Sequence, residues 1–129
     1  MVDQARAELP DECCGLLAGR VEGGIGRVLM RYPLVNAARA PTRFLSDAHS
    51  MFAADRDMRE RQLDILAVYH SHPVSDPIPS RTDLENNYSS EVMNLIISLK
   101  SAEPVIRAWW LTETDVREAE YDVVKEAGG

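Results

Sequence analysis

Residues 65–83 of the 129-residue chain read ILAVYHSHPVSDPIPSRTD, and the expected fold is built outward from this stretch. It begins with a continuous apolar run that ends at His70, which is typical of a strand buried on both faces. Three prolines then favour an extended or turning loop. Ser80 precedes Asp83 by three residues, the spacing of a helix cap, so a short helix is predicted over 80–87.

The sequence before this stretch predicts a helix and a β-hairpin. Residues 2–9 favour a short helix that is closed off by Pro10. Two apolar runs, at 13–21 and 27–33, enclose a glycine-rich segment at 22–26. This pattern is typical of a hairpin whose loop has about three to five residues.

A longer helix is predicted between the hairpin and the buried strand. Its expected N-cap is Ser46 or Asp47, and a short strand at 44–46 precedes it. The side chains that we expect on its buried side, up to its end near residue 63, are Met51, Phe52, Ala54, Met58 and Leu63.

Three further strands are predicted after the short helix, at 92–99, 105–111 and 116–124. Trp109 and Trp110 are consecutive on the second of these strands, so they should face opposite sides of the sheet. The third strand alternates apolar with acidic side chains, which indicates a half-buried strand. Its expected buried positions are Ala119, Tyr121 and Val123.

The composition is that of a globular protein, with 45% hydrophobic and 27% charged residues. These values disfavour disorder, a collagen-like chain and a coiled coil. Helices and strands are mixed, and the chain has no internal repeat and no break in composition. The predicted fold class is therefore α/β, of the α+β kind, in a single domain over residues 1–129.

The net charge limits the classes of binding partner, and the cysteines indicate the cellular compartment. The chain has 21 acidic and 14 basic side chains, and its only dense basic segment, 56–61, is interleaved with acids, which disfavours nucleic acid and anionic membranes. No apolar stretch is long enough to span a bilayer, and the N-terminus does not resemble a signal peptide. Cys13 and Cys14 are adjacent, too close for an unstrained disulfide. A cytoplasmic protein is expected.

The segment around His70 also carries a candidate metal site. Because strand side chains alternate, His70 and His72 point to the same side and can converge on one ion. With a carboxylate as third ligand, such a set leaves one position open, as catalytic zinc sites do. The alternative is a pair of hydrogen-bonded polar residues followed by a simple helix cap at Ser80 and Asp83. The spacing alone leaves both interpretations open.

Two blocks resemble one known family. Residues 70–83 match the H-x-H-P-x6-S-x-x-D signature of the JAMM (MPN+) zinc metalloproteases at every defining position. Residues 10–17, PDECCGLL, resemble that family's upstream P-x-E-x-C-G-L-L segment and lie at the expected distance before the histidines. Two blocks in the right order make the resemblance specific, and it implies a single MPN (JAB) domain. Such a domain is cytidine deaminase-like, with a mixed, curved β-sheet packed between helices.

The resemblance also implies roles for individual residues. His70, His72 and Asp83 match the family's zinc ligands, with one Zn²⁺ per chain and a water as fourth ligand. Glu12 matches the acid that activates this water. Ser80 matches the serine that hydrogen-bonds the water or steadies the oxyanion, and a helix-cap role can coexist with this one.

The implied reaction is hydrolysis of a peptide or isopeptide bond. The compact chain resembles the prokaryotic branch of the family, whose substrates are ubiquitin-like or sulfur-carrier proteins cut after a C-terminal Gly-Gly. A second copy of the chain, in a homodimer, is a further candidate partner. The alternative function is a non-catalytic MPN-type scaffold or interaction module.

Other zinc chemistries and candidate residues fit less well. A zinc deaminase needs H-x-E and P-C-x-x-C, and a zincin needs H-E-x-x-H; the sequence contains none of these. Cys14 resembles a buried packing residue rather than a nucleophile. His49 is expected on the surface rather than as a fourth ligand.

Overall fold

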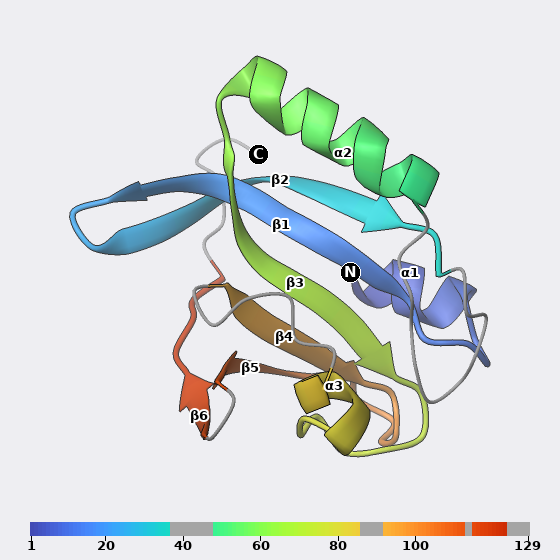
Figure 1. The fold of residues 1–129 in the computed structure, drawn as a ribbon. Helices are drawn as coiled ribbons and strands as arrows, with labels where there is room; N and C mark the ends of the chain where they lie inside the picture. The colour runs from blue at the N-terminus through green and yellow to red at the C-terminus, as the bar shows by residue number, and fades with distance from the viewer. Residues whose placement is uncertain (37–47, 86–91, 113–114, 124–129) are drawn as a thin grey trace.

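A computed structural model of the chain describes residues 1–36, 48–85, 92–112 and 115–123 (Figure 1). The elements follow in the order α1 (Val2–Ala7), β1 (Cys14–Glu22), β2 (Ile25–Leu34), α2 (Ala48–Arg61), β3 (Asp64–His72), α3 (Arg81–Glu85), β4 (Met93–Ser98), β5 (Val105–Leu111) and β6 (Val116–Ala119). The strand predicted at 44–46, and with it the N-cap of the long helix, lies outside the described residues.

The six strands form one sheet in the order β2-β1-β3-β4-β5-β6. Strands β3 and β4 are parallel, and every other neighbouring pair is antiparallel. The mixed sheet confirms the predicted α+β class. β3 has a hydrogen-bonded neighbour on each side, and its last six residues are buried, so the prediction of a strand buried on both faces is confirmed.

The core lies on both faces of this sheet, because strand residues alternate between them. One cluster contains Leu17 and Tyr69 and packs against Ala5 of α1. The other contains Leu16 and packs against Ala54 and other residues of α2. Figure 1 shows α2 running along β1 and β2, with α1 near the start of β1. The sheet is therefore packed between helices, as predicted.

Two predictions about the long helix are wrong in detail. The helix ends at Arg61, so Leu63 lies beyond it. Phe52 is 76% exposed, because it lies on the side of α2 opposite to Ala54 and Met58, which face the sheet. His49, at the first turn of α2, is exposed as expected.

The ends of three other elements also differ from expectation. The first helix stops at Ala7 rather than at residue 9. The hairpin strands extend until only Gly23 and Gly24 connect them, both with positive φ, so the loop has two residues rather than three to five. β6 stops at Ala119, where its pairing with β5 ends, and Val123 beyond it is 88% exposed.

The prediction that Tyr121 is buried is wrong, because it lies beyond the end of β6 and is 43% exposed, and Ala119 is only half-buried. The predictions for the tryptophans and the cysteines agree with the structure. Trp109 is buried beside Ile96 and Leu111, whereas Trp110 is half-buried. Cys13 and Cys14 are buried free thiols in the two different core clusters. Burial, the largest cause, raises the pKa of Cys14 to about 12, so the thiol stays protonated and packs as an apolar group.

Candidate metal centre

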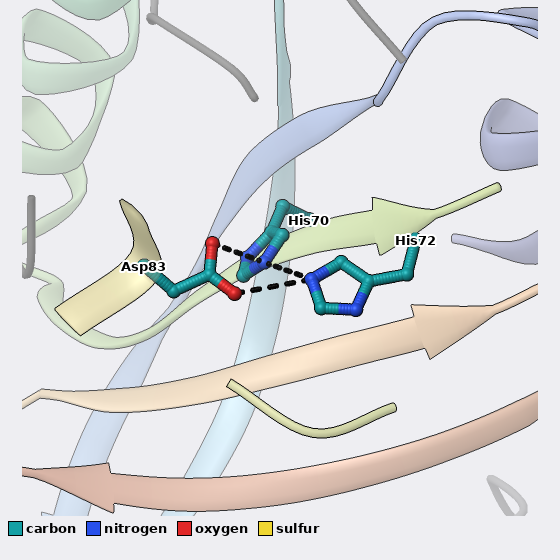
Figure 2. A group of neighbouring side chains, drawn as sticks. All are labelled: His70, His72 and Asp83. Atoms are coloured by element: carbon teal, nitrogen blue, oxygen red, sulfur yellow. Dashed lines mark hydrogen bonds and ion pairs between the residues drawn. The ribbon is translucent and has the colours of Figure 1, made fainter. Parts of the chain in front are cut away.

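Three donor groups meet at the carboxyl end of β3. His70 and His72 lie on this strand and point to the same side, and Asp83 reaches them from α3 (Figure 2). One ligand atom from each residue lies within 4.8 Å of the others. The structure thus brings together the three residues that the sequence singles out as candidate metal ligands.

The spacing of the donor atoms fits a small cation. The Nε2 atoms of His70 and His72 lie 3.0 Å from Oδ1 and Oδ2 of Asp83, respectively. The two Nε2 atoms lie 3.2 Å from each other. Donors bound to one tetrahedral Zn²⁺ are separated by about 3.3 Å, because each lies roughly 2.0–2.1 Å from the ion. The arrangement therefore suits an ion held between the three groups.

The protonation state of His72 follows from its other ring nitrogen. Nδ1 of His72 lies 2.8 Å from the carbonyl oxygen of Asp76. A carbonyl oxygen can only accept, so Nδ1 carries the proton and donates it. In the protonated ring Nε2 also carries a proton and donates it to Oδ2 of Asp83, 3.0 Å away, whereas in the neutral ring Nε2 keeps a lone pair that a metal can take up.

Asp83 is held in place by the start of its own helix. The backbone N–H of Ser80 donates to Oδ2 of Asp83 at 2.8 Å, and the backbone N–H of Asp83 donates to Oγ of Ser80 at 3.1 Å. This reciprocal pair is a capping box. The helix-cap interpretation is therefore confirmed, and the carboxylate that closes the cap also faces both imidazoles.

The electrostatics of this group favour an ionised Asp83. Burial would raise the pKa of Asp83, but hydrogen bonds from His70 and His72 outweigh it and hold the pKa far below its ordinary value. Burial lowers the pKa of His72, but Asp83 and the Asp76 carbonyl outweigh it and raise the pKa overall. Asp83 therefore gives the site a negative charge that attracts cations.

Glu12 lies next to this group and is buried. β1 pairs with β3 so that Cys14 is opposite His70, and continuing this register places Glu12 across from His72. Its side chain is 2% exposed, and Oε1 has no hydrogen-bond partner among the described residues. Burial, with a smaller contribution from Asp83, raises the pKa of Glu12 from 4.5 to about 8, although His72 acts in the opposite direction.

The backbone around Glu12 is fixed from two directions. Ser71, between the two histidines, accepts a hydrogen bond on Oγ from the N–H of Cys13 at 2.8 Å and donates its own N–H to the carbonyl of Cys13. The side-chain amide of Asn36 donates to the carbonyl of Glu12 at 2.8 Å. These hydrogen bonds fix the backbone at Glu12 relative to β3, the strand that carries the histidines.

Sequence reasoning missed Asn36, because it is 24 residues from Glu12 and no local pattern connects them. It also missed two side chains that contact the loop after His72, Ser98 and Trp109. Their partners lie on other segments, so only the tertiary structure identifies them. Ser80 is half-buried at the edge of the site, with its Oγ toward α3.

No helix in the described part of the chain is both long and apolar enough to cross a membrane.

Comparisons with known proteins agree with this architecture. A family model described as prokaryotic homologs of the JAB domain matches residues 1–112. The chain is 30% identical over 127 residues to the CysO-cysteine peptidase of Mycobacterium tuberculosis, covering 98% of this chain and 86% of the relative. It is 32% identical over 102 residues to the desampylase of Pyrococcus furiosus, covering 79% of this chain and 68% of the relative. The solution structure of a protein from Desulfitobacterium hafniense has a TM-score of 0.88 and 35% identity, covering 98% of this chain and 87% of that one.

Proposed function

The chain belongs to the prokaryotic homologues of the JAB domain, and from that premise we propose that it is a zinc-dependent hydrolase of peptide or isopeptide bonds. One observation carries the proposal: His70, His72 and Asp83 converge beside the buried carboxyl group of Glu12, whose Oε1 has no hydrogen-bond partner among the described residues. A scaffold or interaction module has no need for such an arrangement, since burying a polar group without a partner costs free energy.

His70, His72 and Asp83 are the proposed zinc ligands. Imidazole nitrogens and a carboxylate suit Zn²⁺, and three protein ligands leave a position for substrate chemistry. When bound, the ion supplies Lewis-acid catalysis and makes water acidic near neutral pH. The protein's contribution is to hold both Nε2 atoms and the carboxylate at the spacing described above.

Glu12 is the proposed general base and acid. Its raised pKa, about 8, lies closer to neutrality than that of an ordinary carboxyl group. A group of this kind can accept a proton at Oε1 from the attacking water and return it to the leaving amine. A cation held by Asp83 and the histidines would lower the pKa of Glu12 from this value, so that the carboxylate form is available to accept the proton.

Ser80 is the proposed donor to the oxyanion. Its Oγ accepts from the N–H of Asp83, so its hydroxyl proton can be directed to the developing negative charge. A preorganised donor of this kind typically contributes about 10²–10³ in rate.

The proposed substrate is a ubiquitin-like or sulfur-carrier protein, cut after its C-terminal Gly-Gly. Two relatives carry the names CysO-cysteine peptidase and desampylase, and their matches cover most of this chain. Glycine has no Cβ, so a Gly-Gly segment lets the substrate backbone approach a recessed site closely. The charge of −7 fits a protein partner better than nucleic acid. Two buried free thiols fit a cytoplasmic location.

The test combines metal analysis with one conservative variant. Zinc content is measured on the purified chain, and cleavage is then measured on a sulfur-carrier protein extended beyond its Gly-Gly. Glu12→Gln should retain zinc and lose about 10²–10⁴ in rate, because the amide cannot transfer the proton. Asp11→Asn changes the neighbouring carboxyl group and should cleave like the wild type. A wild-type protein without zinc, or a Glu12→Gln variant of full activity, would contradict the proposal.

A further inference from the structure

We propose that Trp109 and Ser98 are positioning residues that hold the loop between His72 and Asp83 so that His72 presents Nε2 to the metal. The inference rests on the proposed function, in which His72 is a metal ligand. It starts from three successive backbone carbonyls, each of which accepts a hydrogen bond from a different side chain. Ser98 Oγ donates to Ser75 at 2.6 Å, His72 Nδ1 to Asp76 at 2.8 Å, and Trp109 Nε1 to Pro77 at 2.9 Å.

Within the loop, the backbone N–H of Ile78 also donates to the carbonyl of Asp76 at 2.8 Å, but this bond does not tie the loop to the sheet. Residues 74–76 are exposed, and Val74 exposes 72% of its side chain, so apolar burial does not anchor this part of the loop. Yet the middle carbonyl, that of Asp76, decides which nitrogen of His72 carries the proton. The two flanking hydrogen bonds tie the residues on either side of this acceptor to strands β4 and β5, and in this way they position the carbonyl on which the ligand nitrogen of His72 depends.

Ser98 approaches the loop from the strand next to the histidines. In the parallel pairing of β3 and β4, His72 lies beside Ser98, and the N–H of Leu99 donates to the carbonyl of His72 at 3.1 Å. Ser98 is buried, so its hydroxyl works in a site with little water to replace the bond. The ligand and the anchor are thus fixed to the same pair of strands.

Trp109 approaches from β5 and is itself braced. Its side chain is 8% exposed and packs with Ile96 and Leu111. The guanidinium carbon of Arg107 lies 4.7 Å from the ring centroid, and Arg107 binds Glu118 of β6 through two hydrogen bonds of 2.8 Å. A chain of contacts therefore runs from β6 through Arg107 and Trp109 to the carbonyl of Pro77.

One further contact of the loop provides a matched control. The ammonium group of Lys100 lies 3.3 Å from Oδ1 of Asp76, but both side chains are more than half exposed. Exposed ion pairs contribute little, whereas Ser98 and Trp109 donate from buried side chains. If the hydrogen bonds to the carbonyls position His72, loss of Lys100 should not affect the metal.

The test measures metal binding rather than catalysis. Trp109→Phe keeps an aromatic ring against Ile96 and Arg107 and removes the N–H donor, together with part of the ring volume. Titration of the 129-residue chain with Zn²⁺ against a chromophoric chelator should show about tenfold or greater loss of affinity, as is typical when an outer partner of a metal-binding histidine is removed. The absorption spectrum of the Co²⁺ form should change as well. Trp110→Phe and Lys100→Ala should match the wild type in both measurements.

Ser98 gives an independent variant in case Trp109→Phe folds poorly, which circular dichroism would show. Ser98→Ala should weaken Zn²⁺ binding, and Ser98→Thr, which restores a hydroxyl donor, should recover it. The inference is overturned if Trp109→Phe and Ser98→Ala bind Zn²⁺ as tightly as the wild type, even if both melt at lower temperature. If the wild type itself binds no Zn²⁺, the proposed function fails together with the inference that rests on it.

Discussion

The carboxyl groups of Asp83 and Glu12 lie in the same site but differ in their hydrogen bonding. On the metal side, formed by His70, His72 and Asp83, the carboxylate has several hydrogen-bond donors, and its pKa falls far below the ordinary value. On the Glu12 side the carboxyl group is buried, its Oε1 has no partner within the described ranges of the chain, and its pKa rises to about 8. Burial raises the pKa of both groups, so the difference comes from the hydrogen bonds that Asp83 accepts and, to a smaller extent, from the charge of His70.

A metal-dependent hydrolase needs one group that binds the cation and another that transfers a proton, and the two carboxyl groups fit these two roles. A group that must hold a cation has to stay charged, and Asp83 does so with hydrogen bonds from His70 and His72. A group that must exchange a proton needs a pKa near the working pH, and Glu12 reaches this through desolvation. The two sides should therefore respond differently to substitution and to pH.

The largest effect is expected from Asp83→Asn. An asparagine still accepts at the helix cap, so α3 should persist, but the negative charge of the metal side is lost. Zinc affinity should fall by about 100-fold or more, and cleavage should fall with it. Zinc titration and circular dichroism measure the two properties separately. If the variant kept wild-type zinc affinity, the metal side would not depend on the ionised carboxylate.

Glu12 should make the metal-free protein less stable as pH rises. Its pKa is about 8 when folded and ordinarily 4.5, so between these values the folded state binds a proton that the unfolded state has released. The contribution is fully present below pH 4.5 and is lost as pH rises to about 8. The loss is on the order of a few kcal/mol.

Denaturant unfolding of the wild type and Glu12→Gln in the presence of chelator, from pH 4.5 to 8, measures this effect. The glutamine does not titrate, and the variant retains His72, so the difference between the two proteins isolates Glu12. Parallel pH profiles would show that Glu12 has an ordinary pKa in the folded state.

A smaller effect is expected from Asn36→Ala, which removes the donor to the carbonyl of Glu12. Loss of one buried hydrogen bond costs about 1–2 kcal/mol. Because this bond holds the backbone of Glu12, we expect its loss to displace the carboxyl group, and an increase of this size in the activation free energy lowers kcat about tenfold. Zinc binding should not change, because no ligand is touched. Val35→Ala, at the exposed neighbouring position, should leave kcat unchanged. If Asn36→Ala lowered zinc affinity about tenfold as well, the Glu12 side and the metal side would not be independent.

The smallest effect is expected at the far end of the hairpin. Gly24 has φ of +78°, so Gly24→Ala should destabilise the protein by about 1 kcal/mol, although a Cβ there meets nothing within 4 Å. Gly26→Ala is the control, since its φ is not in this region and its Cβ meets only Leu66 at 3.5 Å. Thermal melting should separate these variants, and zinc binding should match the wild type in both.

Most elements of the fold could be predicted, because their signals are local. The apolar run before His70 predicted β3, and the two apolar runs around the glycines predicted the hairpin. Errors fell at element ends and at Phe52, where pairing partners and the direction of a helix face decide the outcome. A short apolar pattern does not contain that information.

For this protein, the sequence alone determined the order of the elements, the helix cap at Ser80 and the motif that carries His70, His72 and Asp83. Each depends on residues close together in the chain, where strand alternation and helix geometry set the spacing. Only the tertiary structure decided that Glu12 is buried, with no partner for Oε1 in the part of the chain that the structure describes, while Asp83 has several hydrogen-bonding neighbours. The supporting contacts of Asn36, Ser98 and Trp109 were likewise decided only there. Burial and hydrogen bonding between distant segments are properties of the packed sheet, and they set the charge of each group.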